Sequence, residues 1–473
     1  MVPLKLLRTL LLFSLMGTCF SERILFLLPL ASRSHVNVFE PLMKALGERA
    51  HEIVNLSPII SSNMPPTVQQ IQLITVDDLL GNMPNPFEQR KTGKLWTMLN
   101  SSSLDHMDKA CIKVLETPRL YEMLEKEKFD LVIVDIFLNY CVLGVIPHFK
   151  APSIFISTSS SPSFLTSVVD VLFGVMWDRM FVRKSEDMYR KYLPNGNQLP
   201  GLDEIQANSS LMFTNSHFTI NYPRPLLPDV IEVGGMHTRP AKKLPKLGSI
   251  VKAKDMPENY RKVFLNVFAK LKQRVIWKWE TETMPDLPPN VKLSKWLPQQ
   301  DVLGHPNIRL FITHGGLLST QESIYHGVPV LGIPMFADQD LNVMQAERGG
   351  YAKMVEIVGI TEERLETALL ELLGNPVYLQ KAKDLSKLVQ DLPQTPLEKA
   401  VYWTEYVLRH KGAPHLRSAA RDLNFFQYYV LDVAAVLFVA FALVTYLILS
   451  CCKSIFKRIC GKKSVKHVHF KKE

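Results

Sequence analysis

The chain has 473 residues, 47% of them apolar, and a formal net charge of +10. This length is sufficient for two domains with complete hydrophobic cores. Residues 453–473 alone carry eight positive side chains and one negative side chain, so the charge lies mostly at the end of the chain. The composition therefore argues against a basic nucleic-acid-binding face in the middle of the chain.

Residues 1–21 have the order of a secretory signal peptide. Lys5 and Arg8 precede a short apolar run at residues 10–13, and the segment 17–21 that follows consists of small residues apart from Phe20. A basic segment, an apolar segment and small residues at the cleavage point, in this order, are typical of such signals. We therefore predict that residues 1–21 are a signal peptide.

The first half of the mature chain alternates apolar runs with helical patterns. Such alternation is typical of a parallel sheet covered by helices, and it predicts an α/β domain over residues 22–237. No dinucleotide-binding glycine motif follows the first apolar run, so a nicotinamide enzyme is not indicated. We predict strands at residues 23–30, 51–57, 130–135 and 152–157, and a helix at 39–49.

A second alternating series follows a Pro- and Lys-rich segment at residues 238–246, which we interpret as a linker. The series predicts a second α/β domain over residues 247–395, followed by C-terminal helices at 396–428. Gly327 occupies the position favoured for the C-terminal cap of a helix. We predict strands at residues 274–280, 291–295, 309–313 and 328–334, and helices at 319–326, 361–373 and 396–410.

Residues 433–452 form an uncharged apolar run. A helix of this length spans the hydrocarbon core of a bilayer, about 30 Å thick. We predict a transmembrane helix at residues 429–452, with aromatic side chains at its near edge. The basic tail at 453–473 is expected in the cytosol, because positive charges are retained on that side. These features predict a single-pass type I membrane protein with most of the chain in the lumen.

On the lumenal side, the sequence suggests two kinds of covalent modification. Cys111 and Cys141 either form a disulfide or remain buried free thiols, and no Cys/His spacing indicates a metal site. Asn100 and Asn208 begin Asn-X-Ser sequences in polar, loop-like surroundings, and we predict that both are glycosylated. Asn55 begins a third such sequence but lies in an apolar run, so we expect it to be too structured for modification.

The residues with the clearest chemistry lie between 296 and 339. Trp296 offers a flat face for a base, and Gln299 can both donate and accept hydrogen bonds at a pyrimidine edge. Gly315 and Gly316 join a predicted strand to a predicted helix, whose free amides attract a diphosphate. The hydroxyls of Ser319 and Thr320 add further donors. Together these groups match what a uracil, a diphosphate and a sugar require.

This stretch closely resembles the signature of the UDP-glycosyltransferases of the membrane-anchored animal type, and the likeness extends over essentially the whole chain. The resemblance implies the α/β fold called GT-B, with two Rossmann-like domains facing a cleft. The first domain would hold the acceptor and the second the UDP-sugar. The UDP-sugar-binding positions that it implies are Trp296, Gln299, His314, Gly315, Gly316, Ser319, Thr320, Glu322, Asp338, Gln339 and Ser249.

Within that set, the resemblance also implies individual roles. His314 and Ser319 match positions that contact phosphate, and Glu322 matches the residue that holds the ribose hydroxyls. Asp338 and Gln339 match the pair that grips the sugar, and glucose and glucuronic acid both fit them.

The catalytic residues are less evident from the pattern alone. His35 follows the first predicted strand, and Pro41 indicates that the regular helix begins close behind it. An imidazole near a helix N-terminus is disfavoured as a cation, so His35 should be able to accept a proton. A single loop histidine is more often structural, but the resemblance implies that His35 is the general base and that Asp135 orients it. Asp130 is a rival by residue type, but it begins its strand and so lies at the wrong end of the sheet.

The resemblance thus implies inverting transfer of a hexosyl group from a UDP-sugar to a hydroxyl of a small lipophilic acceptor. The UDP-sugar is a co-substrate, and neither a cofactor nor a metal is expected. The endoplasmic reticulum membrane is the expected location, and a homo- or hetero-oligomer is a further possibility.

One departure from the family pattern lies between Lys246 and Leu247. Relative to that pattern, we expect about twenty residues to be absent, including the first strand of the second domain, which is central in a doubly wound sheet. Each lost core side chain forfeits roughly 1.5–3 kcal/mol, against a domain stability of about 5–15 kcal/mol. The alternative hypothesis is therefore a catalytically inactive family member that binds small molecules or partner proteins.

Overall fold

The computed structural model describes residues 21–81, 85–92, 101–137, 139–158, 182–221, 225–242, 256–281 and 283–460. The chain divides into two compact units, Met1–Leu416 and Arg417–Glu473, which we describe separately. The larger unit contains both α/β regions that the sequence predicts, and we refer to them as the first and second domains. The boundaries drawn from the sequence stay predictions.

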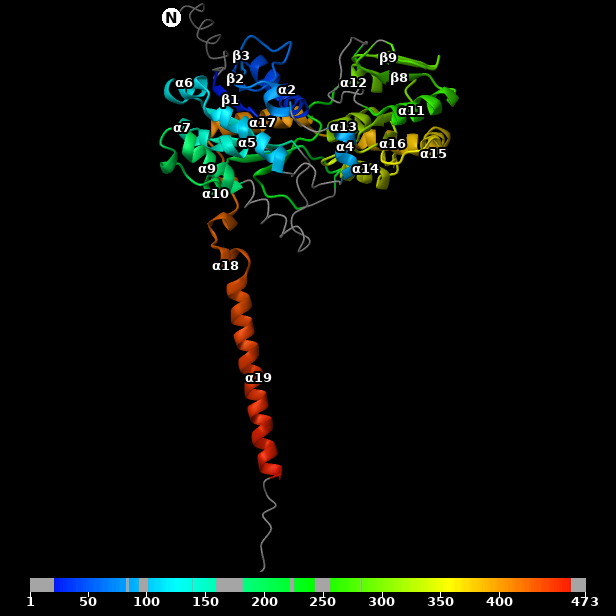
Figure 1. Ribbon diagram of the computed structural model, residues 1–473. Helices are drawn as coiled ribbons and strands as arrows, with labels where there is room; N and C mark the ends of the chain where they lie inside the picture. Colours follow the sequence, from blue (N-terminus) through cyan, green and yellow to red (C-terminus); the bar gives the residue numbers. More distant parts are fainter. Residues whose placement is uncertain are drawn as a thin grey trace, which may run out of the picture. The chain divides into compact units, whose positions relative to one another are not determined.

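The first domain is built on a parallel sheet of seven strands (Figure 1). The strand order is β3-β2-β1-β4-β5-β6-β7, so the order reverses between β1 and β4, as in a doubly wound sheet. The strands predicted at residues 23–30, 51–57, 130–135 and 152–157 are confirmed, although each is slightly shorter. The strands are β1 (Arg23–Leu27), β2 (Glu52–Leu56), β3 (Val68–Ile71), β4 (Leu131–Asp135), β5 (Ser153–Ser157), β6 (Leu211–Thr214) and β7 (Val230–Glu232).

The first helix after β1 is longer than the sequence predicts. We expected a helix over residues 39–49, but α2 spans Arg33–Glu48 and contains Pro41 in its interior. Proline lacks the amide that a helix interior uses, yet the buried side chains on both sides of Pro41 keep the helix packed on the sheet. The other helices are α3 (Val76–Leu80), α4 (Pro86–Thr92), α5 (Ser101–Leu115), α6 (Pro118–Lys126), η1 (Tyr140–Val145), α7 (Ile146–Phe149), α9 (Arg183–Tyr192), η3 (Gly196–Gln198) and α10 (Leu202–Ala207).

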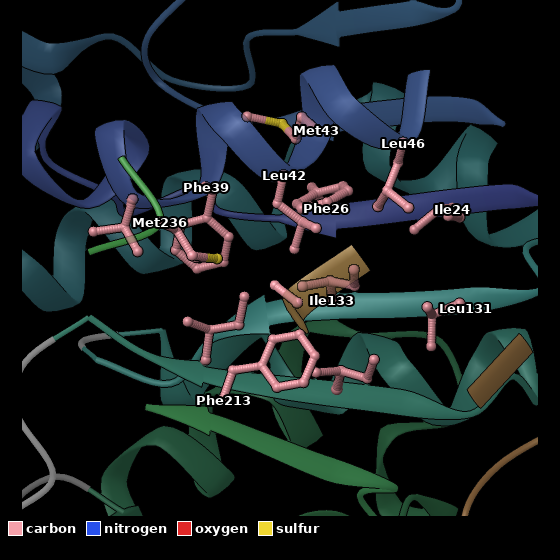
Figure 2. Close-up of a cluster of buried hydrophobic side chains, with 14 of the residues drawn as sticks. Ile24, Phe26, Phe39, Leu42, Met43, Leu46, Leu131, Ile133, Phe213 and Met236 are labelled. Carbon is pink, nitrogen blue, oxygen red and sulfur yellow. The ribbon is translucent and has the colours of Figure 1, made fainter. Parts of the chain in front are cut away.

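One core of the first domain lies between α2 and the sheet, as Figure 2 shows. Phe39 and Leu42 of α2 face Phe26 of β1, and the Phe26 and Phe39 rings meet edge to face with centroids 6.3 Å apart. A late helix, α17 (Pro396–Arg409), completes this core with Val401 and Val407. The chain therefore returns to its first domain after finishing the second.

The opposite face of the first sheet is covered by α5 and by the segment that follows β4. Cys111 of α5 and Cys141 of η1 are joined by a disulfide there. The sequence left these two cysteines open between a disulfide and free thiols, and the structure favours the first alternative. Such bonds persist in oxidising compartments.

The second domain has five strands within the described residues, and they form two separate sheets. β8 pairs with β9, and the strands of the other sheet follow the order β10-β11-β12, with all pairs parallel. The four strands predicted here are confirmed, and Gly327 ends α13 with a φ of 68°. The elements are α11 (Glu258–Lys270), β8 (Val275–Lys278), β9 (Val291–Ser294), α12 (Gln299–Leu303), β10 (Phe311–Thr313), α13 (Leu317–His326), β11 (Val330–Gly332), α14 (Gln339–Arg348), β12 (Ala352–Met354), α15 (Glu362–Gly374) and α16 (Pro376–Gln390).

The two sheets of the second domain share one hydrophobic core although they do not pair. Val291 of β9 and Leu331 of β11 are buried in the same cluster, and Trp277 of β8 and Ile312 of β10 pack against it. In a doubly wound sheet, the first strand lies between the second and the fourth. Taking β8 as the second strand and β10 as the fourth, the two sheets separate at the place of the strand that the sequence analysis expects to be absent, and that absence stays a prediction. Residues 243–255, which include the Lys246–Leu247 junction, lie outside the described residues.

The larger unit ends with η5 (Pro414–Leu416), and the smaller unit then contains η6 (Ala419–Asp422), α18 (Phe425–Tyr428) and α19 (Leu431–Cys460). Residues Leu431–Ile459 of α19 contain an 18-residue stretch with a mean hydropathy of 2.6, and this part of the helix is long and apolar enough to cross a membrane. The helix extends beyond the predicted end at residue 452, through the first basic residues of the tail to Cys460. Residues 1–20 of the predicted signal peptide (residues 1–21) and the tail after Cys460 lie outside the described residues.

Candidate active site

His35 and Asp135 meet at the point where the strand order of the first sheet reverses. His35 lies in the first turn of α2, and Asp135 is the last residue of β4, which pairs with β1. The Nδ1 atom of His35 is 2.6 Å from Oδ2 of Asp135, whose side chain is 0% exposed. Because a carboxylate only accepts hydrogen bonds, Nδ1 is the donor, and Nε2 is the ring atom that can take a proton.

Two residues that the sequence analysis missed also contact this pair. The hydroxyl of Thr158, just beyond β5, lies 3.2 Å from His35 Nδ1 and donates to Asp135 Oδ1 over 3.4 Å. The Phe137 ring is 5.2 Å from the imidazole, and its backbone N–H donates to Asp135 Oδ1. Thr158 follows β5, which lies next to β4 in the sheet, and β4 lies next to β1. The order of these strands is therefore the feature that could have indicated that Thr158 lies near His35 and Asp135.

The loop after β1 is held by a buried amide side chain. Asn139 Oδ1 accepts a hydrogen bond from the Leu30 N–H, and Asn139 Nδ2 donates to the Phe137 carbonyl. This bridge joins the chain that leads to His35 with the chain that follows Asp135. The relative position of the two catalytic candidates is therefore fixed by backbone on both sides.

The glycine turn of the second domain lies between β10 and α13, as the sequence predicts. Gly315 has a φ of 79°, and a Cβ there would lie 2.2 Å from Val343 Cγ2. A Cβ on Gly316 would lie 2.7 Å from His314 Nε2. Gly315 therefore requires glycine, whereas a side chain at Gly316 would displace the His314 ring. The first-turn amides of α13 remain open to an anion.

Gln299, Ser319 and Glu322 form one hydrogen-bonded group beside this turn. Gln299 Nε2 donates to Ser319 Oγ over 3.0 Å and to Glu322 Oε2 over 2.6 Å. Thr320 differs from them, because it is buried and its hydroxyl donates to the Gly316 carbonyl of its own helix. The structure thus places Thr320 as a support of the turn, whereas the other three present side chains to a common point.

Burial changes the pKa values of three titratable groups near this point. It raises the pKa of Glu322 to about 7. It also lowers the pKa of His314 and brings the pKa of His237 to about 4, so both imidazoles are neutral at pH 7. His237 Nε2 lies 3.6 Å from Glu322 Oε1 and 3.3 Å from the Leu318 carbonyl. The sequence analysis did not select His237, which comes from the segment after β7.

Trp296 follows β9 and is partly open, with 38% of its surface exposed. Its carbonyl accepts a hydrogen bond from Ser294 Oγ, which holds the turn after the strand. An exposed indole at the carboxyl end of a strand is suited to stacking on a planar base.

Asp338 and Gln339 stand at the start of α14, where a strained turn places them. Ala337, just before them, has a φ of 59°, which side chains rarely adopt. Gln339 Oε1 accepts from the Met335 and Phe336 amides, which leaves Nε2 as the atom that can donate to a ligand.

Asn342, which the sequence analysis missed, connects the two halves of this region. Its Nδ2 donates to Asp338 Oδ2 over 3.0 Å and to the Gly315 carbonyl over 3.1 Å. One buried amide therefore ties the carboxylate before α14 to the glycine turn before α13. Asn342 follows Asp338 by four residues at the start of one helix, and this spacing is the sequence feature that could have indicated their contact.

The glycine turn is also anchored to the first domain. Leu318 packs against the core between α2 and the first sheet, which includes Val36 next to His35. Gln321 of the same helix donates to both the carbonyl and the side-chain oxygen of Asn215, just after β6. The helix that begins at the turn is therefore held against the domain that carries the His35–Asp135 pair.

Two predicted positions, Ser249 and Asn100, lie outside the described residues. Asn208 is exposed at the C-terminal end of α10, whereas Asn55 is fully buried in β2. Within the described residues, no group of three or more His, Cys, Asp or Glu side chains is arranged to hold a metal ion.

Comparison with known proteins decides the family. A family model described as "UDP-glucoronosyl and UDP-glucosyl transferase" matches residues 143–466. The chain belongs to this family. A UDP-glycosyltransferase from Dactylopius coccus is 32% identical over 92% of the chain and 92% of its own length. A UDP-glucuronosyltransferase from Oryctolagus cuniculus is 30% identical over 90% of the chain and 97% of its own length.

The fold of this transferase is shared with solved structures at lower sequence identity. The calicheamicin glycosyltransferase CalG4 matches with a TM-score of 0.59 at 17% identity, and the match covers 82% of the chain and 99% of that structure. The α/β fold is thus of the GT-B type, as the sequence resemblance implied. A C-terminal apolar helix is added to it.

Proposed function

We propose that this chain transfers a hexosyl group from a UDP-sugar to a hydroxyl of a small lipophilic acceptor, with inversion at the anomeric carbon. The observation that carries the proposal is the contact of His35 with the buried Asp135, 2.6 Å apart, at the strand-order reversal of the first sheet. Family membership supports UDP-sugar as the donor and favours a transferase over the inactive alternative.

The proposed reaction is a direct displacement. His35 Nε2 removes the proton from the acceptor hydroxyl while the oxygen attacks the anomeric carbon. The bond between that carbon and the diphosphate oxygen breaks as the new bond forms, and UDP leaves with the electron pair. Asp135 stabilises the imidazolium that results, because its carboxylate is already hydrogen-bonded to Nδ1.

Departure of UDP is assisted by groups on the second domain. The glycine turn and the α13 N-terminus supply N–H donors and a partial positive charge to the diphosphate. His314 acts as a hydrogen-bond donor and not as a cation, because burial lowers its pKa. We assign Trp296 and Gln299 to the uracil, Ser319 to the phosphates, and Glu322 to the ribose. Thr320 supports the turn from behind.

The sugar itself is assigned to Asp338 and Gln339. The Asp338 carboxylate and the Gln339 Nε2 atom can bind neighbouring hydroxyls of a pyranose. Glucose and glucuronic acid both satisfy these contacts, so each belongs in a test of the donor. The mechanism uses no metal and no cofactor besides the UDP-sugar.

We further propose that the enzyme is a single-pass type I protein of the endoplasmic reticulum membrane, with its site in the lumen. The support is the apolar α19, the Cys111–Cys141 disulfide and the exposed Asn208. The basic tail after α19 favours a cytosolic C-terminus.

The test of this function is thermal unfolding of the detergent-solubilised full chain with and without millimolar UDP. A ligand at about 100 times its dissociation constant adds roughly 2.7 kcal/mol to the native state. We expect a shift with UDP that ADP does not reproduce, and turnover of UDP-glucose or UDP-glucuronic acid with phenolic acceptors. The absence of any UDP-specific shift would favour the inactive family member.

A further inference from the structure

Helix α4 belongs to the first domain by chain order, but it packs into the second domain. It lies between β3 and β4 in sequence, and its Phe87 is buried in the hydrophobic core that surrounds β9 and β11. The ring of Phe87 faces Tyr260 of α11, with centroids 6.1 Å apart. Figure 1 shows α4 among the helices of the second domain.

Arg90 of α4 is completely enclosed by this packing. Its side chain is 1% exposed, and it forms ion pairs with both Asp340 and Glu356. Its Nη1 and Nη2 atoms bond the two Asp340 oxygens at 2.6 and 2.8 Å. Its Nε and Nη2 atoms bond the two Glu356 oxygens at 3.0 and 2.7 Å. One arginine therefore makes two bidentate contacts, the geometry in which a guanidinium binds carboxylates most specifically.

The position of Asp340 gives this arrangement its significance. Asp340 directly follows Gln339 in the first turn of α14, and Glu356 lies just after β12. An acidic side chain near the N-terminus of a helix interacts favourably with the helix dipole, so Asp340 stabilises α14 without a partner. A buried cation at the same place has the opposite interaction with the dipole, so the stability of α14 alone does not explain Arg90. Without the guanidinium, two carboxylates would face each other in a partly buried space.

We propose that Arg90, supplied by the first domain, is a positioning residue that sets Asp338 and Gln339 to grip the sugar of the UDP-sugar. The proposal rests on the proposed function and concerns the same site. Arg90 fixes the start of α14 against the end of β12, and both sugar-gripping residues lie at that start. The diphosphate turn has an anchorage of its own, because α13, the helix that it begins, is bonded to Asn215 through Gln321. The sugar part of donor binding therefore depends on Arg90, and the UDP part does not.

The test measures by calorimetry the affinity of the full-length protein for UDP and, separately, for UDP-glucose and UDP-glucuronic acid. The ratio of the affinity for each UDP-sugar to the affinity for UDP is then compared between variants. We expect Arg90→Gln to weaken UDP-sugar binding roughly tenfold or more while UDP binding changes little. Arg90→Lys keeps the charge but loses the bidentate contacts, so it should show the same pattern with less risk to folding. Arg261→Lys is the matched control, because Arg261 is a buried arginine of the second domain paired with Glu258. It should leave the ratio of the two affinities unchanged.

Three results have distinct meanings. A change in the ratio for the Arg90 variants alone supports the positioning role. An equal loss of UDP and UDP-sugar affinity, or an unchanged ratio in Arg90→Lys, overturns it and makes Arg90 a structural tether. If the unmodified chain binds neither ligand, the proposed function fails, and this inference fails with it.

Discussion

The two domains of the larger unit differ in how their sheets are completed. The first has seven strands in one continuous parallel sheet, whereas the second has five described strands divided into two sheets over a shared core. The catalytic candidates sit at the ends of adjacent strands of the continuous sheet. The nucleotide-binding candidates lie in the loops and helices that follow strands of the divided one. We thus assign the chemistry to the domain with one continuous sheet and donor binding to the domain with two sheets. Substitutions in each domain can test these two assignments separately.

The largest expected effect is on the chemistry carried by the first domain. His35→Ala should lower kcat by about 10²- to 10⁴-fold, because the general base is lost, and leave UDP affinity intact. Initial rates and calorimetry with UDP measure the two quantities. Parallel loss of turnover and UDP binding would sink the assignment of His35 as the base. Asp135→Asn should lower kcat as well, since an amide does not stabilise the imidazolium.

The second prediction concerns the stability of the first domain alone. Cys141→Ser should reduce its free energy of unfolding by about 2–4 kcal/mol, because the disulfide no longer restricts the unfolded chain. Hydrogen exchange in urea measures the effect, with amides of β1 and β4 exchanging faster and those of β11 unchanged. Cys452→Ser, in the exposed part of α19, is the control. Equal loss in both domains would mean that they unfold as one cooperative unit.

The third prediction is a pH dependence of the second domain. Burial raises the pKa of Glu322 to about 7, from about 4.5 in the unfolded chain, so the fold favours its protonated form. This contribution to stability is complete below pH 4.5 and is lost as the pH rises through 7, amounting to at most about 3 kcal/mol. His237 has the opposite effect, because burial lowers its pKa to about 4 and charging it at low pH opposes folding.

Glu322→Gln isolates the first of these two effects. The difference in unfolding free energy between the unmodified chain and this variant should change between pH 5 and pH 7.5, with the unmodified chain losing more stability at the higher pH. Chemical denaturation at the two pH values measures it. Glu363→Gln, in the exposed first turn of α15, is the control. A constant difference across this range would show that Glu322 is ionised throughout.

The smallest expected effect concerns Thr158. Thr158→Val should lower kcat about three- to tenfold, because one hydrogen bond to the His35–Asp135 pair is lost, and the KM for the UDP-sugar should not change. Thr214→Val is a matched control on the neighbouring strand, because within the described part of the chain the Thr214 hydroxyl is buried without a hydrogen-bond partner. A similar loss of activity in both variants would indicate a packing effect.

Four strands in each domain could be predicted from the sequence, because buried strands appear as apolar runs. The sequence analysis did not predict β6, β7 and β12, which have only three or four residues each. β3 was missed because two of its four residues, Gln69 and Gln70, are polar. The extent of α2 was missed because Pro41 suggested a helix start, and only the packing of the residues before it overrides that local preference.

The candidate site could be predicted where its residues are close together in the sequence. The segment from Trp296 to Gln339 contains all the donor-binding candidates except Ser249 in one stretch. Thr158, His237 and Arg90 were missed because each reaches its partners from a distant part of the chain. Their residue types alone carry no signal. Only the folded arrangement of strands brings them to Asp135, Glu322 and Asp340.

The return of α17 to the first domain has a consequence for biosynthesis. The core between α2 and the first sheet needs Val401 and Val407, which are translated only after the entire second domain. At about 5–20 residues per second, the ribosome adds them roughly 10–30 s after Met236, the last earlier member of that core. During this interval an incomplete apolar face is present on the nascent chain, and the second domain is made while the first still waits for its final helix. Chaperones that bind emerging apolar surfaces therefore have a defined period in which to act on this protein.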